Sequence, residues 1–305
     1  MGRFTFLAAI VLSGMAATGP AAARDAAPAV SAGSASDFAV GPQYDTTHVY
    51  VAPEDFDRFV ASLTATFGGT TTKKGAFQVT PTTSKTFSQL VLTPAGSVSV
   101  FGFTTPIPFP FGSERNGYLV TDMEAAVASA VKHGATRTIT TFPDPIGRDA
   151  VVQWPGGVGM QVYWHTAKPN CPVLATVPEN RVYLTPDAAD AFVKSWNGFA
   201  HGRIVSDVRA ANGVEIGRPG STYRRVRISS GYGETTVLIS DNQLPWPYGR
   251  DMTGYKVANL LDTLSKGRAA GVETLVEPHA EEGRQSAIVR FPGGYIAEIH
   301  SPVTP

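Results

Sequence analysis

An internal repeat constrains this chain more than any other feature of its sequence. The segment Pro-Phe-Pro-Phe-Gly at 108–112 corresponds to Pro-Trp-Pro-Tyr-Gly at 245–249. The two segments lie 137 residues apart, and the same spacing relates Gly117 to Gly254. Proline and glycine set turns, so their agreement in both halves indicates two copies of one fold.

A second match, nearer the start of each half, defines the extent of the two copies. His-Val-Tyr-Val-Ala-Pro at 48–53 corresponds to Arg-Val-Tyr-Leu-Thr-Pro at 181–186, with a spacing of 133 residues. We therefore predict a first domain at 45–168, a proline-punctuated linker at 169–177 and a second domain at 178–305.

Each predicted domain divides again into two similar units. A β-rich run at 49–51 is followed by Pro53, which is expected to open a helix, and by apolar residues at helical spacing, namely Phe56, Phe59, Val60 and Leu63. Three extended segments follow, and the order recurs from 118–120, with a helix predicted between Asp122 as N-cap and Gly134 beyond its end. Each domain thus consists of two βαβββ units, which predicts an α+β fold with mixed curved sheets and helices outside.

The first residues are typical of a secretory signal peptide. Arg3 precedes an apolar stretch at 4–14, and small residues at 21–23 place a cleavage site before Arg24. The alternative is a membrane anchor, although the stretch is shorter than the roughly 20 residues that span a bilayer. We expect residues 1–23 to be removed, and 24–44 to form a flexible leader. The protein would be exported, to the periplasm of a Gram-negative cell or otherwise into the medium.

Composition excludes several classes of partner. The chain has 25 Lys and Arg against 25 Asp and Glu, so its net charge of zero argues against nucleic acid. Cys171 is the only cysteine, which excludes an internal disulfide and a cysteine-based zinc site. The sequence has no phosphate-binding glycine loop, so we expect no nucleotide or organic cofactor. We expect a small-molecule ligand, no membrane anchor, and either a monomer with internal pseudo-symmetry or a homodimer.

The paired units and their endings resemble the vicinal oxygen chelate superfamily, which includes glyoxalase I, fosfomycin-resistance proteins and extradiol dioxygenases. The endings are Gly-Gly-Val-Gly-Met-Gln-Val-Tyr-Trp-His at 156–165 and Gly-Gly-Tyr-Ile-Ala-Glu-Ile-His at 293–300. The resemblance implies that each domain folds into a cup around its ligand. It also implies a divalent metal, commonly held by one His on the first strand of each unit and a Glu on the last strand.

This sequence matches that ligand pattern only in part. The corresponding positions are His48, Gly117 and Gln161 in the first domain, and Arg181, Gly254 and Glu298 in the second. Each half lacks the middle ligand. The resemblance implies His48, Gln161 and Glu298 as catalytic residues, with His48 and Gln161 as metal ligands. Two alternatives remain: His48 is a hydrogen-bonded strand histidine, and Glu298 forms an ion pair with Arg181.

The repeated loops supply candidates for substrate binding. Prolines restrict the backbone, so the aromatic residues between them would suit an organic ligand at the mouth of a cup. An Arg before the penultimate strand could clamp an anion. The candidates are Phe109, Phe111, Arg115, Tyr118, Arg148, Tyr163, Tyr183, Trp246 and Tyr248. Alternatively, the loops pack the two domains together, and Arg148 belongs to a surface turn.

Two functional hypotheses follow from these residues. The first is an exported lyase, isomerase or ring-opening enzyme, metal-assisted through His48 and Gln161, that acts on a small oxygenated organic compound. The second is a metal-free protein of the same fold that sequesters a small molecule.

Overall fold

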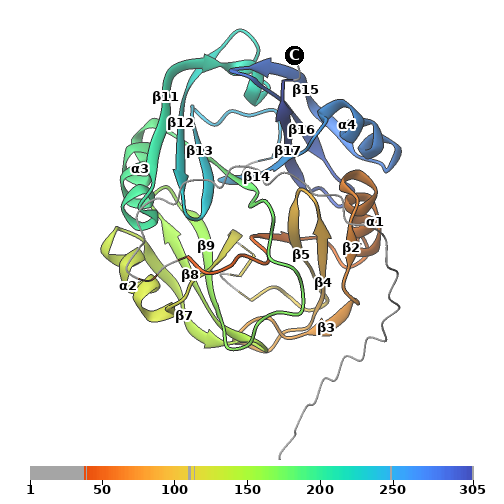
Figure 1. Cartoon of the computed structure of the whole chain (residues 1–305), viewed down its shortest axis with the longest axis vertical. Coiled ribbons are helices and arrows are strands. Elements are labelled where there is room, and N and C mark those ends of the chain that lie inside the picture. The colour runs from red at the N-terminus through yellow and green to blue at the C-terminus, as the bar shows by residue number, and fades with distance from the viewer. Residues whose placement is uncertain (1–37, 39, 109–110, 113, 248, 304–305) are drawn as a thin grey trace, which may run out of the picture. The chain divides into compact units, whose positions relative to one another are not determined.

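Figure 1 shows a computed structural model of the chain, which describes residues 38, 40–108, 111–112, 114–247 and 249–303. The predicted signal peptide, most of the leader, Phe109 and Tyr248 lie outside these residues, as does the side chain of Arg115. The following account concerns the compact unit that begins at Ala32.

The first half of the described chain forms one mixed sheet in the order β2-β4-β5-β1-β6-β9-β8-β7, with β3 paired to β4. Its strands are β1 (Thr47–Tyr50), β2 (Thr70–Thr71), β3 (Gly75–Phe77), β4 (Thr86–Thr93), β5 (Gly96–Phe103), β6 (Glu114–Leu119), β7 (Thr136–Pro143), β8 (Gly147–Trp154) and β9 (Val158–His165). At the centre β1 pairs antiparallel with β6, and each of them pairs in parallel with the last strand of its own unit.

The second half repeats this topology in the order β11-β12-β13-β10-β14-β17-β16-β15. Its strands are β10 (Glu179–Leu184), β11 (Arg203–Asn212), β12 (Thr222–Ser230), β13 (Gly233–Ile239), β14 (Asp251–Lys256), β15 (Glu273–Glu281), β16 (Arg284–Arg290) and β17 (Ile296–Pro302). Two sheets of matching strand order confirm the predicted α+β architecture of two tandem glyoxalase-like domains, each built from two βαβββ units.

Each unit carries one helix between its first and second strands. The helices are α1 (Phe56–Phe67), α2 (Met123–Lys132), α3 (Pro186–Ala200) and α4 (Leu260–Ala269), and a short 3-10 helix, η1, spans Gly213–Ile216. The Asp122 side chain caps α2 by accepting from the Ala125 amide at 3.0 Å, and Asn259 caps α4 in the same way. Gly134 follows α2 with φ of 100°, a conformation that favours glycine.

The two largest hydrophobic cores join the two domains instead of dividing them. One core combines the second unit of the first domain with the first unit of the second domain, where the Trp154 and Trp196 rings meet edge to face at 5.6 Å. The other core combines α1 with α4, and Phe59 meets Phe291 at 6.0 Å. Figure 1 shows these helix pairs, α2 with α3 and α1 with α4, side by side. The helices therefore cover the outer faces of the sheets, which leaves the inner faces to form cups.

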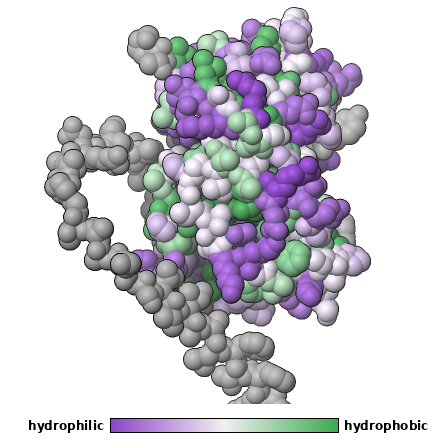
Figure 2. All heavy atoms as spheres, turned by 90° about the vertical axis from the view of Figure 1, so that its right-hand side faces the viewer, coloured by the Kyte–Doolittle hydropathy of each residue, from purple (hydrophilic) through white to green (hydrophobic). Residues whose placement is uncertain are grey.

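The surface over α1 and α4 intersperses hydrophilic with hydrophobic residues (Figure 2). Among the described residues, no helix is both long and apolar enough to cross a membrane.

Candidate functional site

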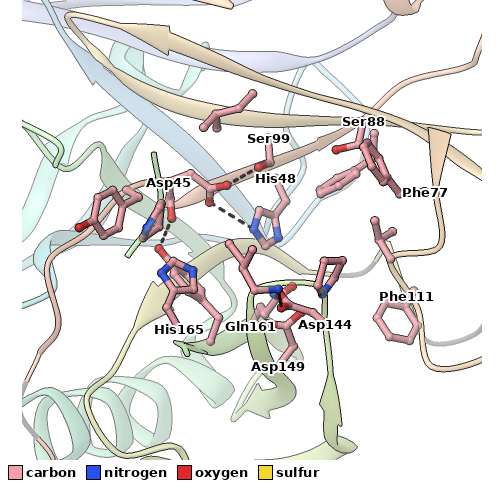
Figure 3. Close-up of a pocket in the computed structure, with 18 of the residues that line it drawn as sticks. Asp45, His48, Phe77, Ser88, Ser99, Phe111, Asp144, Asp149, Gln161 and His165 are labelled. Atoms are coloured by element: carbon pink, nitrogen blue, oxygen red, sulfur yellow. Dashed lines mark hydrogen bonds and ion pairs between the residues drawn. The ribbon is translucent and has the colours of Figure 1, made fainter. Parts of the chain in front are cut away.

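The cup of the first domain holds an open cavity of about 350 Å³ (Figure 3). Aromatic side chains form a continuous part of its wall. On β1 and β5, the Tyr50 ring stacks on Phe101 at a centroid distance of 5.5 Å and on Phe103 at 6.2 Å. The full set of aromatic lining residues is Tyr44, Tyr50, Phe77, Phe101, Phe103, Phe111 and Tyr163. This volume and wall suit a small organic molecule.

Polar side chains also line the cavity. They reach it because alternate residues of a strand point to the same face, as Gln161, Tyr163 and His165 do on β9. The polar lining residues are Asp45, His48, Ser88, Ser99, Asp144, Asp149, Gln161 and His165. Of the predicted site residues, the structure thus brings His48, Gln161, Phe111 and Tyr163 into one cavity.

His48 is buried in this cup beside a carboxylate. Its Nε2 atom lies 3.6 Å from Oδ1 of Asp45, and the edge of its ring faces Phe101 at 5.7 Å. The other Asp45 oxygen accepts a hydrogen bond from the Ser99 hydroxyl, and the Tyr163 hydroxyl donates to the Asp45 backbone carbonyl. Asp45 is therefore held in position to orient the imidazole of His48.

Asp149 on β8 is a site residue that the sequence analysis did not identify. Its side chain is only 6% exposed, and its Oδ1 atom has no hydrogen-bond partner among the described residues. Burial and the nearby Asp144 carboxylate raise the pKa of Asp149 well above its usual value, against smaller lowering effects of His48 and Gln161. The cup therefore contains a carboxyl group whose protonated form is favoured by its surroundings.

Arg148, the predicted anion clamp, points away from the cavity that its neighbour Asp149 lines. Its guanidinium lies over the Trp164 ring at 5.1 Å and 3.6 Å from a carboxylate oxygen of Glu124. Successive residues of a strand point to opposite faces of the sheet. Because Arg148 points to the outer face, Asp149 must point to the face that lines the cup. This alternation is the signal that could have identified Asp149.

The dipeptide Gly-Arg occurs next to the penultimate strand of each domain, at 147–148 and at 283–284, but strand register shows that the two dipeptides do not correspond. Asp149 pairs with Tyr163 in the first sheet, and Ser286 pairs with His300 in the second. These pairs correspond, so the structural counterpart of Arg148 is Gln285. Aligning the Gly-Arg dipeptides shifts the strand by one residue, and such a shift moves every side chain to the other face.

The donor set in the cup does not fit a divalent metal of the superfamily type. A side chain at Gly117 would be needed as the middle ligand, but a Cβ atom there would lie 3.0 Å from Cε1 of His48. The ring of His48 thus occupies the space of that ligand. No group of three or more His, Cys, Asp or Glu residues in the described part of the chain could hold a metal ion. His48 and Gln161 alone are two neutral donors, and we derive no chemical step through a metal.

The corresponding positions of the second domain carry buried ion pairs. Arg181, the counterpart of His48, is fully buried with Nη1 at 3.1 Å from Glu179 Oε1 and Nη2 at 3.0 Å from Glu215 Oε1. Nη1 also lies 3.8 Å from Oε1 of Glu298, which agrees with the ion pair expected between these two residues. Glu298 further accepts from Arg284, and its Oε2 lies 2.8 Å from Nδ1 of His300. Glu298 therefore belongs to this network and does not line the first-domain cavity.

The arginines decide the charge state of these carboxylates. Burial alone would raise the pKa of Glu215, but Arg181 and Arg225 lower it to about 2. Burial likewise opposes ionisation of Glu298, yet Arg284 and Arg181 hold its pKa below the usual value. The network is thus ionised at neutral pH.

Side-chain size explains why one cup is open and the other is filled. In the registers of the two sheets, three arginines of the second domain correspond to three smaller residues of the first. The arginines are Arg181, Arg225 and Arg284, and their counterparts are His48, Ser88 and Gly147.

The other predicted substrate-binding residues lie outside the first cup. Tyr118 is a core residue that contacts Trp196 and Tyr232. Tyr183 and Trp246 meet edge to face at 6.0 Å and line a separate cavity of about 490 Å³. Both residues belong to the second domain, so this contact packs that domain internally and does not join the two domains.

Comparison with known proteins identifies the fold. No protein-family model matches the sequence, and no curated protein is detectably similar to it. The structure is similar to that of a triple mutant of 4-hydroxymandelate synthase from Streptomyces coelicolor, with 13% identity, a TM-score of 0.60 and coverage of 87% of this chain and 93% of that one. It is also similar to a xylose isomerase-like TIM barrel/4-hydroxyphenylpyruvate dioxygenase fusion protein, with 13% identity and a TM-score of 0.54. That match covers 92% of this chain and 51% of the fusion protein, so the chain spans about half its length.

With the strand order of both sheets, these similarities show a vicinal oxygen chelate-like fold in two tandem domains. The resemblance recognised in the sequence is confirmed at the level of the fold.

Proposed function

We propose that this protein is a lyase or isomerase that acts on a small organic compound in the cup of its first domain. The observation that carries the proposal is the open cavity of about 350 Å³, in which the buried carboxyl of Asp149 and the imidazole of His48 lie among aromatic walls. The similarity of the fold to a synthase and a dioxygenase fusion protein supports a role in the chemistry of small organic compounds.

The two groups supply the proton acceptor and the proton donor that such a reaction needs. A lyase or isomerase removes a proton at one position of its substrate and delivers one at another, which requires a base and an acid in reach of one molecule. In this proposal His48 accepts the proton, and the Asp45 carboxylate, 3.6 Å from Nε2, stabilises the imidazolium. Asp149 supplies a proton because its surroundings favour the protonated form.

Export remains part of the proposal. It rests on the charged, apolar and small-residue pattern of residues 1–23. Expression in a bacterial host with N-terminal sequencing tests it: a mature chain that begins at Arg24 supports export, and an intact Met1 contradicts it.

Proton exchange tests the proposed chemistry directly. The probes are three aromatic carbonyl compounds with exchangeable protons at Cα, the carbon next to the ketone: 2-hydroxyacetophenone, 2-aminoacetophenone and phenylpyruvate. In D₂O the mature protein should accelerate deuterium incorporation at Cα of at least one probe, as followed by proton NMR. Asp149→Asn and His48→Ala should each lower that rate by about 100-fold. Asp262→Asn is the control, because Asp262 is exposed on α4 and pairs with Lys266.

A second candidate function is sequestration of a small molecule without reaction. It is favoured by the incomplete ligand set, since neither domain presents three metal-ligating side chains at the superfamily positions. Probe binding that depends on the cup, without any exchange at Cα, would support sequestration and contradict the enzyme.

A further inference from the structure

We infer that the ligand of the first cup is an organic amine, whose ammonium group binds among Asp45, Asp144 and Asp149 while its apolar body contacts the aromatic wall. This inference rests on the proposed use of the cup as a ligand site, and it specifies the charge of the ligand.

The charges around the cavity are of one sign. Its described lining includes the carboxyl groups of Asp45, Asp144 and Asp149 but no Lys or Arg. The two lining histidines do not compensate fully, because burial lowers the pKa of His165. An anionic ligand would meet carboxyl groups without a cation to pair with, whereas a cation would be attracted.

The hydrogen-bonding capacity that the protein leaves unused also points to a donor. Asp45 accepts from Ser99, and Asp144 Oδ1 accepts from the amide of Ile146 at 2.7 Å. Asp149 Oδ1, by contrast, is buried without a partner in the described structure and lines the cavity. A buried acceptor without a donor costs free energy, and an ammonium group offers three donors and a positive charge. An amine therefore supplies what Asp149 lacks, and the positive charge of a bound ammonium group favours the ionised form of Asp149 over the protonated form that the surrounding protein favours.

The aromatic wall adds to this preference. Tyr50, Phe101 and Phe103 lie next to one another along β1 and β5 and line the same cavity as the three carboxyl groups. Aromatic faces attract cations and at the same time accept the apolar body of a ligand.

The second domain shows how the same fold neutralises acidic groups internally. There Glu179, Glu215 and Glu298 are paired with arginines, two of which are Arg181 and Arg284. The first domain has carboxyl groups in its cup but His48, Ser88 and Gly147 in place of the arginines. Its negative charge is therefore left for a ligand to balance.

Three probes of similar size and different charge test the inference. They are 2-phenylethylamine, 2-phenylethanol and phenylacetate, titrated into the mature full-length protein at neutral pH by calorimetry and ligand-observed NMR. The amine should bind at least about tenfold more tightly than the alcohol, and the acid should bind most weakly.

Replacing single aspartates by asparagine tests which carboxyl groups bind the ammonium group. Asp149→Asn and Asp144→Asn should each weaken amine binding by about tenfold and leave binding of the alcohol unchanged, because the cavity keeps its shape. Asp262→Asn should change neither. Circular dichroism confirms that each variant is folded, and the unchanged alcohol affinity shows that its cup is intact.

The possible failures separate the two proposals. If phenylacetate binds as tightly as the amine, the inference is wrong while the cup remains a ligand site. If the amine binds but Asp144→Asn and Asp149→Asn leave its affinity unchanged, the inference is also wrong. If no probe binds at millimolar concentration, the cup is not a site for such molecules, and the proposed function fails together with the inference.

Discussion

At the scale of single residues, the neighbours Arg148 and Asp149 have different roles. The sequence pointed to Arg148 as a ligand-binding residue, but it is Asp149 that lines the cavity. Arg148 drew attention because arginines clamp anions, yet it stacks on Trp164 outside the cup. Asp149 faces the cavity beside Gln161. Acid–base sites often contain a carboxyl group whose pKa is raised by burial and by a second carboxylate.

Asp149 should make the folded protein less stable as pH rises. Its pKa is raised in the folded state, so between its ordinary value of 3.8 and the folded value the folded protein holds more protons than the unfolded chain. The free energy of unfolding therefore decreases with pH across that window. Asp149→Asn removes this dependence. The free energy of unfolding of the variant should therefore exceed that of the wild type by an amount that grows as pH rises above about 4.

Urea unfolding at several pH values measures this effect for the wild type, Asp149→Asn and the exposed control Asp262→Asn. Parallel stability curves for the wild type and Asp149→Asn would show that Asp149 ionises as readily in the folded protein as in the unfolded chain.

The mature protein should contain little divalent metal. His48 and Gln161 are two neutral donors, and the His48 ring occupies the space above Gly117 that a third ligand needs. We expect less than about a tenth of an equivalent per chain by elemental analysis, and no change in Tm on adding chelator. A stoichiometric metal that is lost in His48→Ala would overturn this expectation and restore the metal-assisted mechanism.

At the scale of secondary-structure elements, strand register decides which residues meet. The helices follow from local signals: Asp122 and Asn259 cap α2 and α4 as predicted, and the apolar positions of α1 are buried. The helix α1 begins at Phe56, whereas its start was predicted at Pro53. Register is different, because it depends on pairing between strands far apart in the chain.

The ion pairs across β10, β12, β16 and β17 should be costly to break. Arg181→Met leaves Glu179, Glu215 and Glu298 buried with fewer counter-charges, and we expect a loss of about 3–5 kcal/mol in the free energy of unfolding. Lys266→Met breaks the exposed pair with Asp262 and should cost less than about 1 kcal/mol. Chemical unfolding at neutral pH compares the two variants, and equal losses would contradict the role assigned to the buried network.

At the scale of the whole molecule, the sequence repeat and the cores divide the chain differently. The repeat defines two domains, but each of the two largest cores combines one unit from each domain. Tyr118 illustrates the difference, since its ring lies against Trp196 and Tyr232 of the other domain.

Neither half should fold alone. Residues 45–168 by themselves would expose the apolar faces of α1 and α2 that α4 and α3 cover in the full chain. We expect no cooperative thermal transition for this fragment and one for the mature chain, both followed by circular dichroism. A sharp transition of the isolated fragment would show that the shared cores are dispensable.

The repeat, its turn residues and the helix caps were sufficient to predict four βαβββ units, because these signals are local and recur at similar spacings in both halves. The resemblance to the vicinal oxygen chelate superfamily added the cup, with His48, Gln161 and Tyr163 in it, and the repeated loops added Phe111. The sequence could not show that Asp149 faces the cavity or that arginines fill the second cup. Those features depend on which side chains share one face of a sheet, and pairing between distant strands decides that only in the tertiary structure.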